Sequence, residues 1–555
     1  MRQSSTAKAW MRTWSAVVVL LLLSAARIFG ATITVTSTAD SGPGSLPAAI
    51  ASAANGDTIN FNLTYPTTIT VSTPLTLGPS VTIAGPGASD LTISGAFSVG
   101  VIVVNAGATV QISGVTITEG GSGLGGCIFN GGTLTLTNTT VTNCMNFAEL
   151  GGAILNAGSA ATLNLSNSTV VANFAGAYLG SGGVIQSSQS VLGAGGGIFN
   201  YLGAVTLTNS TVSHNLTYGG PDNYGGGGGG IFNFGGNVVL NSSTVYFNTS
   251  SNGGGIYNGG AGTLTLINST IAGNSAPGAG GGIENDSSTA VVSFSTVWNN
   301  SASGNPDATT VSLNLPPTGS GGSCCIFILS GPGGGIDNSG PLTIKNSILS
   351  ANTAPFSGNC QNDAPSSELT SLGHNLSDDA TCTFFTGTGD LNSTAAGLAP
   401  AGLQNNGGPT ETVALLATSA AVNAIPVSPT NYCTDANGNP VTTDQRGVPR
   451  PQGSGCDIGA FEYFHSLYLV PAVQTLVLAD AVQSSTLPRI VQVVLKVPLQ
   501  AAVDSLNQGN VRAAKGQLEA FVILVDVDRL AGGLSQEEAA AWTSSATAII
   551  QSLGS

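Results

Sequence analysis

Residues 253–274 read GGGIYNGGAGTLTLINSTIAGN, and this stretch decides the fold. A glycine run closes on Ile-x-Asn, an alternating apolar stretch follows, and Asn-Ser-Thr ends the unit. Short β-branched runs of period two, separated by Gly and Asn, predict a solenoid whose rungs are strands. The shortest interval between units is 25 residues, from Asn233 to Asn258. The unit occurs seven times between Gly123 and Asn346, with its first element ending at Asn130, Asn156, Asn200, Asn233, Asn258, Asn285 and Asn338.

A rung of about 25 residues holds roughly three short strands and three turns, which is the perimeter of a parallel β-helix. Ile and Leu at alternate positions are expected to point inward and to stack on their counterparts about 4.8 Å away in the next rung. Each repeated asparagine is expected where a strand bends, because Asn tolerates left-handed backbone angles and stacked copies can hydrogen-bond along the column. The longer intervals, 157–197 and 286–333, leave room for outward loops or for a degenerate extra rung each.

The composition suits an extracellular chain. Gly accounts for 78 of 555 residues, charged residues for 7%, and the mean hydropathy is +0.28. No apolar run of about 18 residues follows the N-terminal region, so the apolar content is expected inside the solenoid. Residues 1–30 have the pattern of a secretory signal peptide, in which cations precede the apolar run 16–26 and cleavage falls between Ala26 and Ala31. The alternative is a single anchor helix.

The formal net charge is −15, and the cations are scarce in the body of the chain. Between residues 31 and 465 only Lys345, Arg446 and Arg450 stand against 20 acidic residues. Nucleic acid and anionic membrane surfaces are poor partners for such a field. We therefore expect no nucleic-acid partner, and no transmembrane domain once the signal peptide is removed.

Eight cysteines in a chain with an export signal predict disulfides. Cys360 with Cys382 and Cys433 with Cys456 would close local loops after the repeats, and Cys127 with Cys144 could form a third bridge across the first full rung. Cys324 and Cys325 are adjacent, and the sequence assigns them no pairing. The alternative is free buried thiols. Metal binding by these cysteines is disfavoured, because no His or second Cys pair has ligand spacing.

Two N-terminal features resemble known families. GSLPAAIASAANGDTINF (44–61), followed by ITVSTPLTLGPSVTIAGPGASDLTISG (69–95), resembles the CSLREA region of secreted bacterial β-helix proteins, although its Cys is missing and Pro47 stands where Arg is usual. Residues 45–54 have the pattern of a short amphipathic helix, which could cover the open edge of the first rung. The GGAI (151–154) and F/Y-x-N elements resemble those of chlamydial polymorphic outer-membrane proteins.

A third resemblance covers the segment after the repeats. LQNNGGPTETVALLATSAAVNAIP (403–426) and TDQRGVPRPQGSGCDIGAFE (443–462) resemble the choice-of-anchor Q domain of surface or secreted β-helix proteins. Five charged residues are concentrated here and are expected to form a partly buried ion-pair cluster that ties the segment to the last rung, because unpaired burial is costly. A ligand pocket is the alternative. The five are Asp444, Arg446, Arg450, Asp457 and Glu462.

From Leu495 the apolar spacing becomes helical, with breaks at 509–510 and 532–533 and a capping box at Ser535 and Glu538. This predicts a small three-helix bundle, and the stretch 507–550 resembles the FIMAH domain of secreted bacterial proteins. Together the patterns and resemblances predict a mainly β protein, a single-stranded right-handed parallel β-helix of the pectin-lyase-like type. Its expected parts are a signal peptide (1–30), an N-terminal cap with the first rungs (31–118), the repeats (119–355), a disulfide-containing end (356–465), a linker (466–494) and the helical domain (495–555).

The position between Ile and Asn in each glycine element is expected to point outward. Its aromatic members, Phe129, Phe199, Phe232 and Tyr257, predict an exposed ladder for sugar rings or a partner's strands. The alternative is a stripe covered by the chain's own loops. Further along the same column stand Glu284 and Asp337, with Asp286 close by.

If Glu284 and Asp337 are neighbours, their carboxylates stand about 5 Å apart, the separation used for retaining glycoside hydrolysis. Such acids could also hold Ca²⁺ or raise one another's pKa, and the simplest alternative is that they are solvated. Lyase chemistry is disfavoured, because Lys345 is the only cation of the repeats.

The favoured function is therefore a structural or adhesive role, with glycans or cell-envelope components as partners and no catalysis, on a protein secreted by or displayed on a bacterium. A polysaccharide hydrolase that uses these carboxylates is the alternative.

Overall fold

The structure is a computed structural model, and it describes residues 30–121, 124–146, 150–176, 193–218, 226–303, 313–314, 323–324, 332–355, 357–363, 365, 368–463, 469–483, 485, 487–507 and 510–553. The predicted signal peptide lies outside the described residues except for Gly30. Cys325 also lies outside them, and only the backbone of Cys324 is described.

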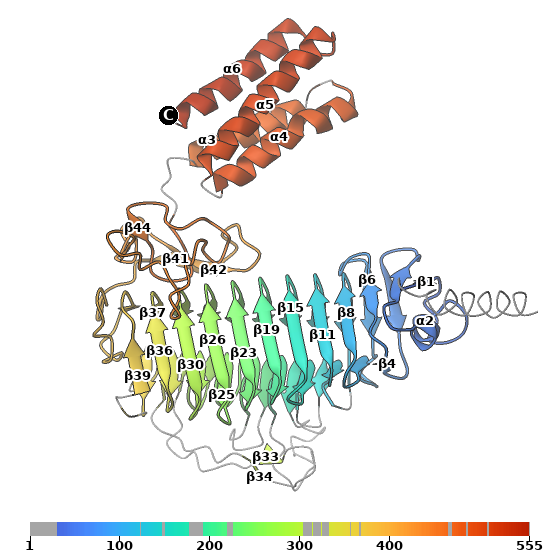
Figure 1. Ribbon diagram of the computed structural model, residues 1–555, viewed down its shortest axis with the longest axis vertical. Coiled ribbons are helices and arrows are strands. Elements are labelled where there is room, and N and C mark those ends of the chain that lie inside the picture. The colour runs from blue at the N-terminus through green and yellow to red at the C-terminus, as the bar shows by residue number, and fades with distance from the viewer. Residues whose placement is uncertain are drawn as a thin grey trace, which may run out of the picture.

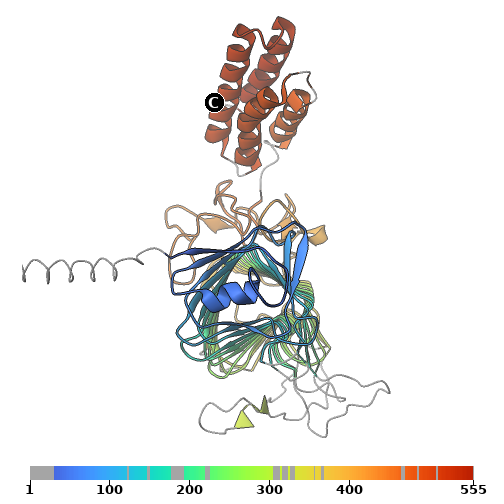
Figure 2. The ribbon, with the colours of Figure 1, turned by 90° about the vertical axis from the view of Figure 1, so that its right-hand side faces the viewer.

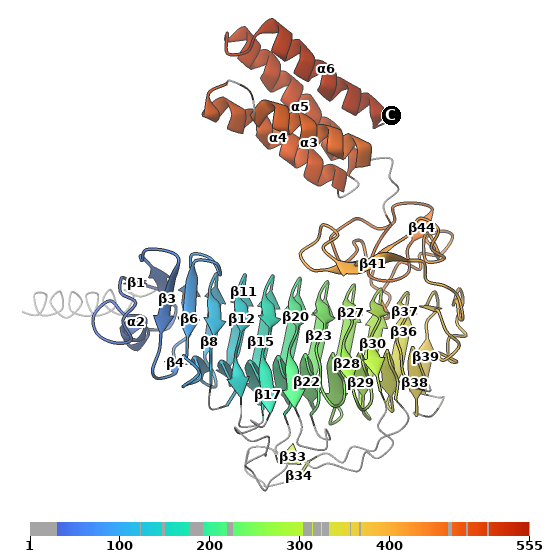
Figure 3. The same ribbon diagram turned by 180° about the vertical axis from the view of Figure 1, so that it is seen from behind.

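Three long parallel sheets wrap the described chain into a solenoid (Figures 1 and 3). Sheet A contains β1 (Thr32–Val35), β2 (Thr58–Phe61), β5 (Thr82–Ala84), β8 (Thr109–Ser113), β11 (Thr133–Thr137), β15 (Thr162–Ser166), β19 (Ala204–Thr208), β23 (Asn237–Asn241), β26 (Thr263–Ile267), β30 (Thr289–Ser293), β36 (Leu342–Lys345) and β39 (Leu369–Ser371). Sheet B contains β3 (Thr67–Thr70), β6 (Leu91–Ser94), β9 (Thr116–Thr118), β12 (Thr140–Thr142), β16 (Thr169–Val171), β20 (Thr211–Ser213), β24 (Thr244–Tyr246), β27 (Thr270–Ala272), β31 (Thr296–Trp298), β37 (Ile348–Ser350) and β40 (Leu376–Ser377). Sheet C contains β4 (Leu75–Leu77), β7 (Ile102–Val104), β10 (Ile128–Asn130), β14 (Ile154–Ala157), β18 (Ile198–Tyr201), β22 (Ile231–Phe234), β25 (Ile256–Gly259), β29 (Ile283–Asn285), β35 (Ile336–Asn338) and β38 (Cys360–Asn362).

Each repeat contributes one strand to sheet C, then to sheet A, then to sheet B, so the predicted right-handed parallel β-helix is confirmed. Short additional strands follow sheet B in several rungs, and further short pairs are antiparallel. The additional parallel strands are β13 (Met145–Asn146), β17 (Phe174–Gly176), β21 (Leu216–Tyr218), β28 (Ser275–Ala276) and β32 (Ser301–Ala302). The antiparallel pairs are β33 (Leu313–Asn314) with β34 (Ser323–Cys324), β41 (Leu398–Gln404) with β42 (Thr412–Leu415), and β43 (Ile425–Pro426) with β44 (Gly455–Cys456).

The interior is a stack of aliphatic columns, as the alternation predicts. In sheet C, Ile128 pairs in register with Ile154, and in sheet A, Leu134 pairs with Leu163. These side chains are fully buried and belong to one continuous core that runs from Val35 to Phe385. Because a one-residue slip would turn every apolar side chain outward, this pattern fixes the register of each rung.

The predicted asparagine ladder is confirmed. In each rung the Ile-x-Asn amide Nδ2 donates to the Oδ1 of the next copy at 2.7–2.8 Å. The left-handed backbone, however, belongs to a different column, the asparagine of Asn-Ser-Thr, with φ of 48–54°. The reason is that the ladder asparagines still belong to sheet C strands, whereas the Asn-Ser-Thr asparagines stand at the corner between sheets A and B. The ladder contains Asn130, Asn156, Asn200, Asn233, Asn258, Asn285, Asn338 and Asn362, and the left-handed column contains Asn138, Asn167, Asn209, Asn268 and Asn346.

A second amide ladder follows sheet B, and its side chains are also buried. Each amide Nδ2 donates to the Oδ1 of the next member at 2.8–3.0 Å, so all the amides point the same way along the solenoid. The last amide donates to the Asp378 carboxylate at 2.7 Å. The carboxylate therefore meets the donor end of the aligned amide dipoles, where negative charge is stabilising. The members are Asn173, Asn215, Asn248, Asn274, Asn300, Asn352 and Asn359.

The three predicted disulfides are confirmed. Cys127 and Cys144 are bonded in the first full rung. In later rungs a glycine stands at the Cys127 position and an asparagine at the Cys144 position. In a later rung the Gly197 Cα faces the Asn215 amide so closely that an added Cβ would lie 3.1 Å from its Nδ2. Cys360–Cys382 lies in the core at the far end, and Cys433–Cys456 lies in the segment beyond it. Disulfides of this number indicate an oxidising, extracellular compartment.

The N-terminal end of the solenoid is closed by the predicted helix, α2 (Leu46–Ser52), which lies across the open rung (Figure 2). The Ser45 side chain caps it by accepting from the Ala48 N–H at 3.3 Å. Leu46 and Ile50 are buried in the main core. The helix therefore covers a rung edge that would otherwise expose unpaired backbone groups.

Residues 392–463, which we call the clasp, lie along the side of the solenoid rather than on its last rung alone. The clasp is hydrogen-bonded to threonines of three successive sheet B strands. The Thr244 hydroxyl donates to the Glu411 carbonyl (2.7 Å), the Thr270 hydroxyl donates to the Gln445 Oε1 (2.6 Å), and the Thr296 hydroxyl accepts from the Ala460 N–H (3.0 Å). The prediction of a tie to the last rung was therefore too narrow. The threonines recur in register, so one extended segment can contact several rungs.

The C-terminal domain contains four described helices instead of the predicted three: α3 (Leu469–Gln483), α4 (Arg489–Asn507), α5 (Val511–Leu530) and α6 (Gln536–Ser552). The predicted linker 466–494 was wrong, because α3 and the start of α4 occupy most of it. Residues 469–483 are apolar on nearly every face, so no one-sided period marks a helix, and Pro471 is tolerated in the first turn. The helices share their own core, and none of those described has the length and apolarity of a membrane span.

Candidate functional site

The aromatic column of sheet C points away from the main core, but it is not exposed. Phe199 and Phe232 are 0% exposed and Tyr257 is 1% exposed, in a separate cluster with Leu150 and Ala194. The predicted exposed ladder was therefore wrong for these three residues, and Phe129 is half-buried. The alternative, a stripe covered by the same chain, is the arrangement that the structure has.

The cover consists of short loop segments that bridge from rung to rung over the rings, at Leu150, Ala194, Gly227 and Asn252. Phe232 stacks on Tyr257 with centroids 4.7 Å apart. A Cβ on Gly227 would lie only 2.4 Å from the Phe232 ring. The glycine runs are thus required partly because the covering chain passes so close to the aromatic side chains.

Glu284 and Asp337 continue this column and pair in register in adjacent strands, β29 and β35, as predicted. They are 9% and 4% exposed, so the prediction of solvated carboxylates was wrong. The Asp337 Oδ2 accepts from the Gly333 N–H at 2.8 Å, whereas the buried Glu284 Oε2 has no hydrogen-bond partner among the described residues. Asp286 lies close by and accepts from the Tyr257 hydroxyl at 2.7 Å.

Burial raises the pKa of Glu284 well above its usual range, and the charges of Asp337 and Asp286 raise it further. Burial likewise raises the pKa of Asp337 to about 7, opposed by the Gly333 N–H and reinforced by the charges of Asp363 and Asp286. A carboxyl group with a raised pKa can act as a proton donor at neutral pH. It can do so only for a substrate that reaches it, and both residues are more than nine-tenths buried.

Among the described residues, no group of three or more His, Cys, Asp or Glu side chains is arranged to hold a metal ion. The Ca²⁺ alternative for Glu284, Asp286 and Asp337 stays a prediction without a coordination sphere to support it. Hard cations such as Ca²⁺ require about six oxygen ligands, and two of these three carboxyl groups are buried at separate heights of the column.

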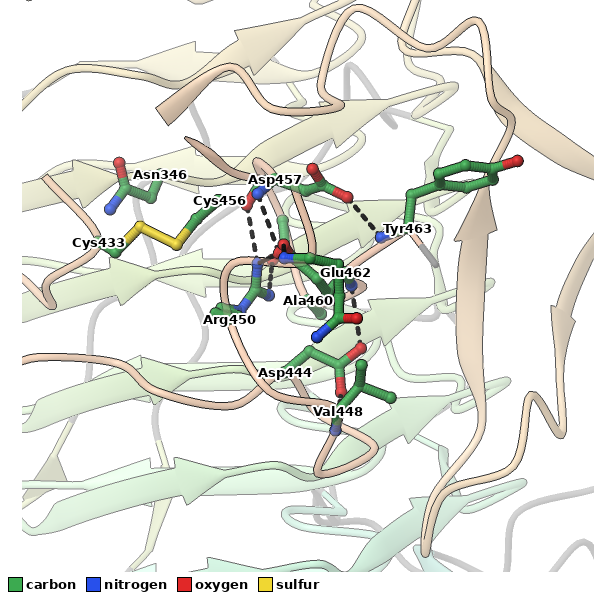
Figure 4. A network of polar contacts seen from close by, with 12 residues as sticks. Asn346, Cys433, Asp444, Val448, Arg450, Cys456, Asp457, Ala460, Glu462 and Tyr463 are labelled. Atoms are coloured by element: carbon green, nitrogen blue, oxygen red, sulfur yellow. Dashed lines mark hydrogen bonds and ion pairs between the residues drawn. A yellow bond between two sulfur atoms is a disulfide. The ribbon is translucent and has the colours of Figure 1, made fainter. Parts of the chain in front are cut away.

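The clasp brings its five charged residues together, as predicted. Figure 4 labels Asp444, Arg450, Asp457 and Glu462. The Arg450 Nη1 contacts the Glu462 carboxylate at 2.7 Å, and its Nη2 donates to the Gly459 carbonyl at 2.6 Å. Arg446 contacts the Asp444 carboxylate at 2.7 Å. The side chains of the first pair are 0% and 1% exposed, so each charge is compensated where water cannot reach it.

Asp457 is the fifth member of the cluster. Burial and the charge of Glu462 together raise its pKa to about 7, against the N–H groups of Asn423 and Tyr463 and the charge of Arg450. Arg450 also lies over the Phe294 ring of the solenoid at 4.7 Å. Because both arginines are paired with carboxylates from within the chain, the cluster fits the structural interpretation better than a ligand pocket, although the buried Arg450 Nε has no hydrogen-bond partner among the described residues.

The most exposed aromatic cluster on the solenoid was missed by the sequence analysis. It consists of His214, Tyr246 and Phe247, at and just after the ends of β20 and β24. Its signal is the pair of adjacent aromatic residues in VVLNSSTVYFN (238–248), which no other copy has, although Trp298 stands at the Tyr246 position of a later copy. The sequence analysis instead selected the position between Ile and Asn of each glycine element, where loop segments cover the aromatic side chains.

The helical domain presents a second surface. A groove of about 380 Å³ lies between α3 and α6, lined by Gln474, Val477, Leu478, Ala481, Trp542, Ser545, Ala548 and Ile549. Eight large apolar side chains of this domain are exposed: Leu476, Val477, Val493, Val494, Val497, Ile523, Val527 and Leu530. Such exposed apolar surface is typical of interaction sites.

Comparison with known proteins adds little beyond the fold. No model of a protein family and no curated sequence matches this chain. One solved structure, described as the crystal structure of pectate lyase Pel9A, is similar with a TM-score of 0.43 and 16% identity, over 78% of this chain and 97% of that chain. At this level of likeness no activity transfers between the two proteins.

Proposed function

We propose that this protein is an extracellular structural β-helix with an adhesive role and that it does not cleave polysaccharide. The proposal includes secretion by the predicted signal peptide and a glycan or another cell-envelope component as the partner. The solenoid supplies a long, rigid body, and its amide ladders and three disulfides suit a chain that must persist outside the cell.

The observation that carries the proposal is that the groups of the solenoid best suited to catalysis are engaged or sealed. Glu284 and Asp337 are buried beneath the loop segments. Lys345 donates to the Thr434 hydroxyl at 2.6 Å and to the Asp435 carbonyl at 3.0 Å, and both arginines are paired inside the clasp. A polysaccharide that lies on the surface therefore meets none of these groups.

A hydrolase remains the second candidate, and one observation favours it. Glu284 and Asp337 are register neighbours, and the pKa of Asp337 is raised to about 7, which is the property of a general acid. This candidate requires the covering segments to open, because acid and nucleophile must both contact the glycosidic bond.

The test is to incubate the purified secreted chain with insoluble and soluble polysaccharides and with isolated cell envelopes, and to measure co-sedimentation and newly formed reducing ends. We expect co-sedimentation without product, and no unsaturated product from polygalacturonate with or without Ca²⁺. Release of reducing ends that Glu284→Gln or Asp337→Asn abolishes, with the β-helix still folded, would establish the hydrolase instead. Failure to sediment with any of these materials would contradict the adhesive role.

A further inference from the structure

The exposed aromatic cluster at the clasp edge has the composition of a ligand-binding surface. The His214 ring lies 5.4 Å from Tyr246 and 5.5 Å from Phe247, and the Tyr246 and Phe247 rings lie 5.3 Å apart. All three contacts are edge-to-face, which is a favoured arrangement for aromatic groups. Phe247 is 48% exposed and His214 is exposed, so solvent reaches the cluster.

The backbone holds the Phe247 ring in place. Phe247 occupies the left-handed corner after sheet B, with φ of 50°, and the next rung has Gly273 at the same corner. A Cβ on Gly273 would lie 2.4 Å from the Phe247 ring, so the ring lies directly against that glycine. A ring ordered before binding loses less conformational entropy when a ligand stacks on it.

Polar groups stand beside the rings. Ser213 pairs in register with Tyr246 on the neighbouring strand, and Glu411 of the clasp is bound to Thr244 on the strand of Tyr246 itself. Burial raises the pKa of Tyr246, and the hydrogen bond from Ser213 opposes this while the charge of Glu411 adds to it, so the hydroxyl stays protonated. Apolar faces with a few placed hydroxyl and carboxylate groups are the usual lining of sites for small polar ligands.

The charges of the solenoid select the class of ligand. Within the described part of residues 30–463, Lys345, Arg446 and Arg450 are all engaged inside the fold, while Glu411 stands at the cluster. An anionic ligand would find no cation here and would meet a carboxylate. A neutral ligand with hydroxyl groups and an apolar face has no such penalty.

We infer that His214, Tyr246 and Phe247, together with Ser213 and Glu411, form a binding site for a neutral polysaccharide, on which a sugar ring stacks against Phe247. This inference rests on the proposed adhesive function and assigns it a place and a ligand class. The clasp completes the site, since Glu411 is held there by its own carbonyl on Thr244 at 2.7 Å.

The test is affinity electrophoresis of the full secreted chain in gels that contain a soluble neutral polysaccharide, with a β-glucan, a galactomannan and an arabinoxylan as separate probes and polygalacturonate as the anionic comparator. We expect retardation by at least one neutral probe and none by polygalacturonate. Phe247→Ala should weaken the Kd at least about tenfold, since a large apolar contact is lost. Tyr246→Phe, which keeps the ring and removes the hydroxyl, should have a smaller effect.

The matched control is Phe97→Ala. Phe97 is 47% exposed and also occupies a left-handed corner, with φ of 55°, but it stands far from the cluster on an early rung. Circular dichroism checks that each variant is folded. Retardation that persists in Phe247→Ala, or that Phe97→Ala weakens equally, would overturn the site while leaving adhesion intact. No retardation by any neutral probe would overturn the inference, and the envelope sedimentation experiment then decides the proposed function separately.

Discussion

Replacing Asp337 by asparagine should stabilise this protein at alkaline pH, and the structure indicates by how much. The pKa of Asp337 is raised from 3.8 to about 7, chiefly by burial. The folded chain therefore holds a proton that the unfolded chain has lost between these pH values, so stability falls as the pH rises from about 4 to about 7. A difference of about 3 pKa units corresponds to about 4 kcal/mol, at 1.4 kcal/mol for each unit.

The side chain of the Asp337→Asn variant cannot ionise, so the variant should not lose this stability. The new side-chain oxygen can still accept from the Gly333 N–H, and the new amide nitrogen can donate toward Glu284, whose buried Oε2 has no partner in the described part of the chain. At pH 4 the two proteins should be similar, because Asp337 is then protonated in the native state. At pH 8 the variant should be more stable than the wild type by up to about 4 kcal/mol. Water that reaches the ionised Asp337 of the wild type would reduce this difference.

The assay is urea denaturation of the full secreted chain from pH 4 to pH 9, followed by the β-sheet circular dichroism signal. Glu368→Gln is the matched control, since Glu368 is an exposed carboxylate near the same end of the solenoid and its replacement should leave the pH profile unchanged. If the profiles of Asp337→Asn and the wild type coincide between pH 4 and pH 8, the carboxyl group is not protonated in the folded protein, and the reasoning from burial fails.

Three further experiments test the solenoid and the clasp. Asn258→Leu should lower the free energy of unfolding by about 3 kcal/mol in urea denaturation, because it removes two ladder hydrogen bonds and leaves the buried Asn285 Oδ1 without the amide that donates to it, while Asn233 Nδ2 keeps its backbone acceptors. An effect below about 0.5 kcal/mol would show that the ladder relaxes around the gap. The double variant Cys127→Gly, Cys144→Asn recreates the glycine and asparagine pair of later rungs. In calorimetry it should have a higher melting temperature than the control variant Cys127→Ser, Cys144→Ser. Equal melting temperatures would mean that the asparagine amide adds no stability in the first rung. Arg450→Met alone should lower the free energy of unfolding by about 3–5 kcal/mol and make the clasp sensitive to limited proteolysis, because Glu462 is left buried without its partner. The double variant with Glu462→Leu should recover much of this stability. A double variant that is cleaved as readily as the single one would contradict the burial argument.

Several features could be predicted from the sequence because they depend on local chemistry repeated in register. A strict alternation of apolar residues can satisfy only a strand, and repetition at about 25 residues stacks equal side chains on one another. The sheets and the Asn130 ladder follow from this one-dimensional periodicity. The three disulfides were predictable for a different reason, because their cysteines lie close together along a chain with an export signal. The sequence also placed Glu284 beside Asp337, because each stands at the same position of its repeat.

The tertiary structure alone decided what is exposed. Whether Phe199 or Phe232 is exposed to solvent depends on the path of the loop segments that cover them. The glycines of these segments do not reveal that path in the sequence. The same cover makes Asp337 a buried acid rather than a solvated one. Likewise, the clasp contacts Thr244 and Thr270 from far along the chain, at separations of 167 and 175 residues, which no local pattern encodes. Periodicity therefore fixes the direction of a side chain, whereas long-range packing determines its solvent exposure, its pKa and the ligands that can reach it.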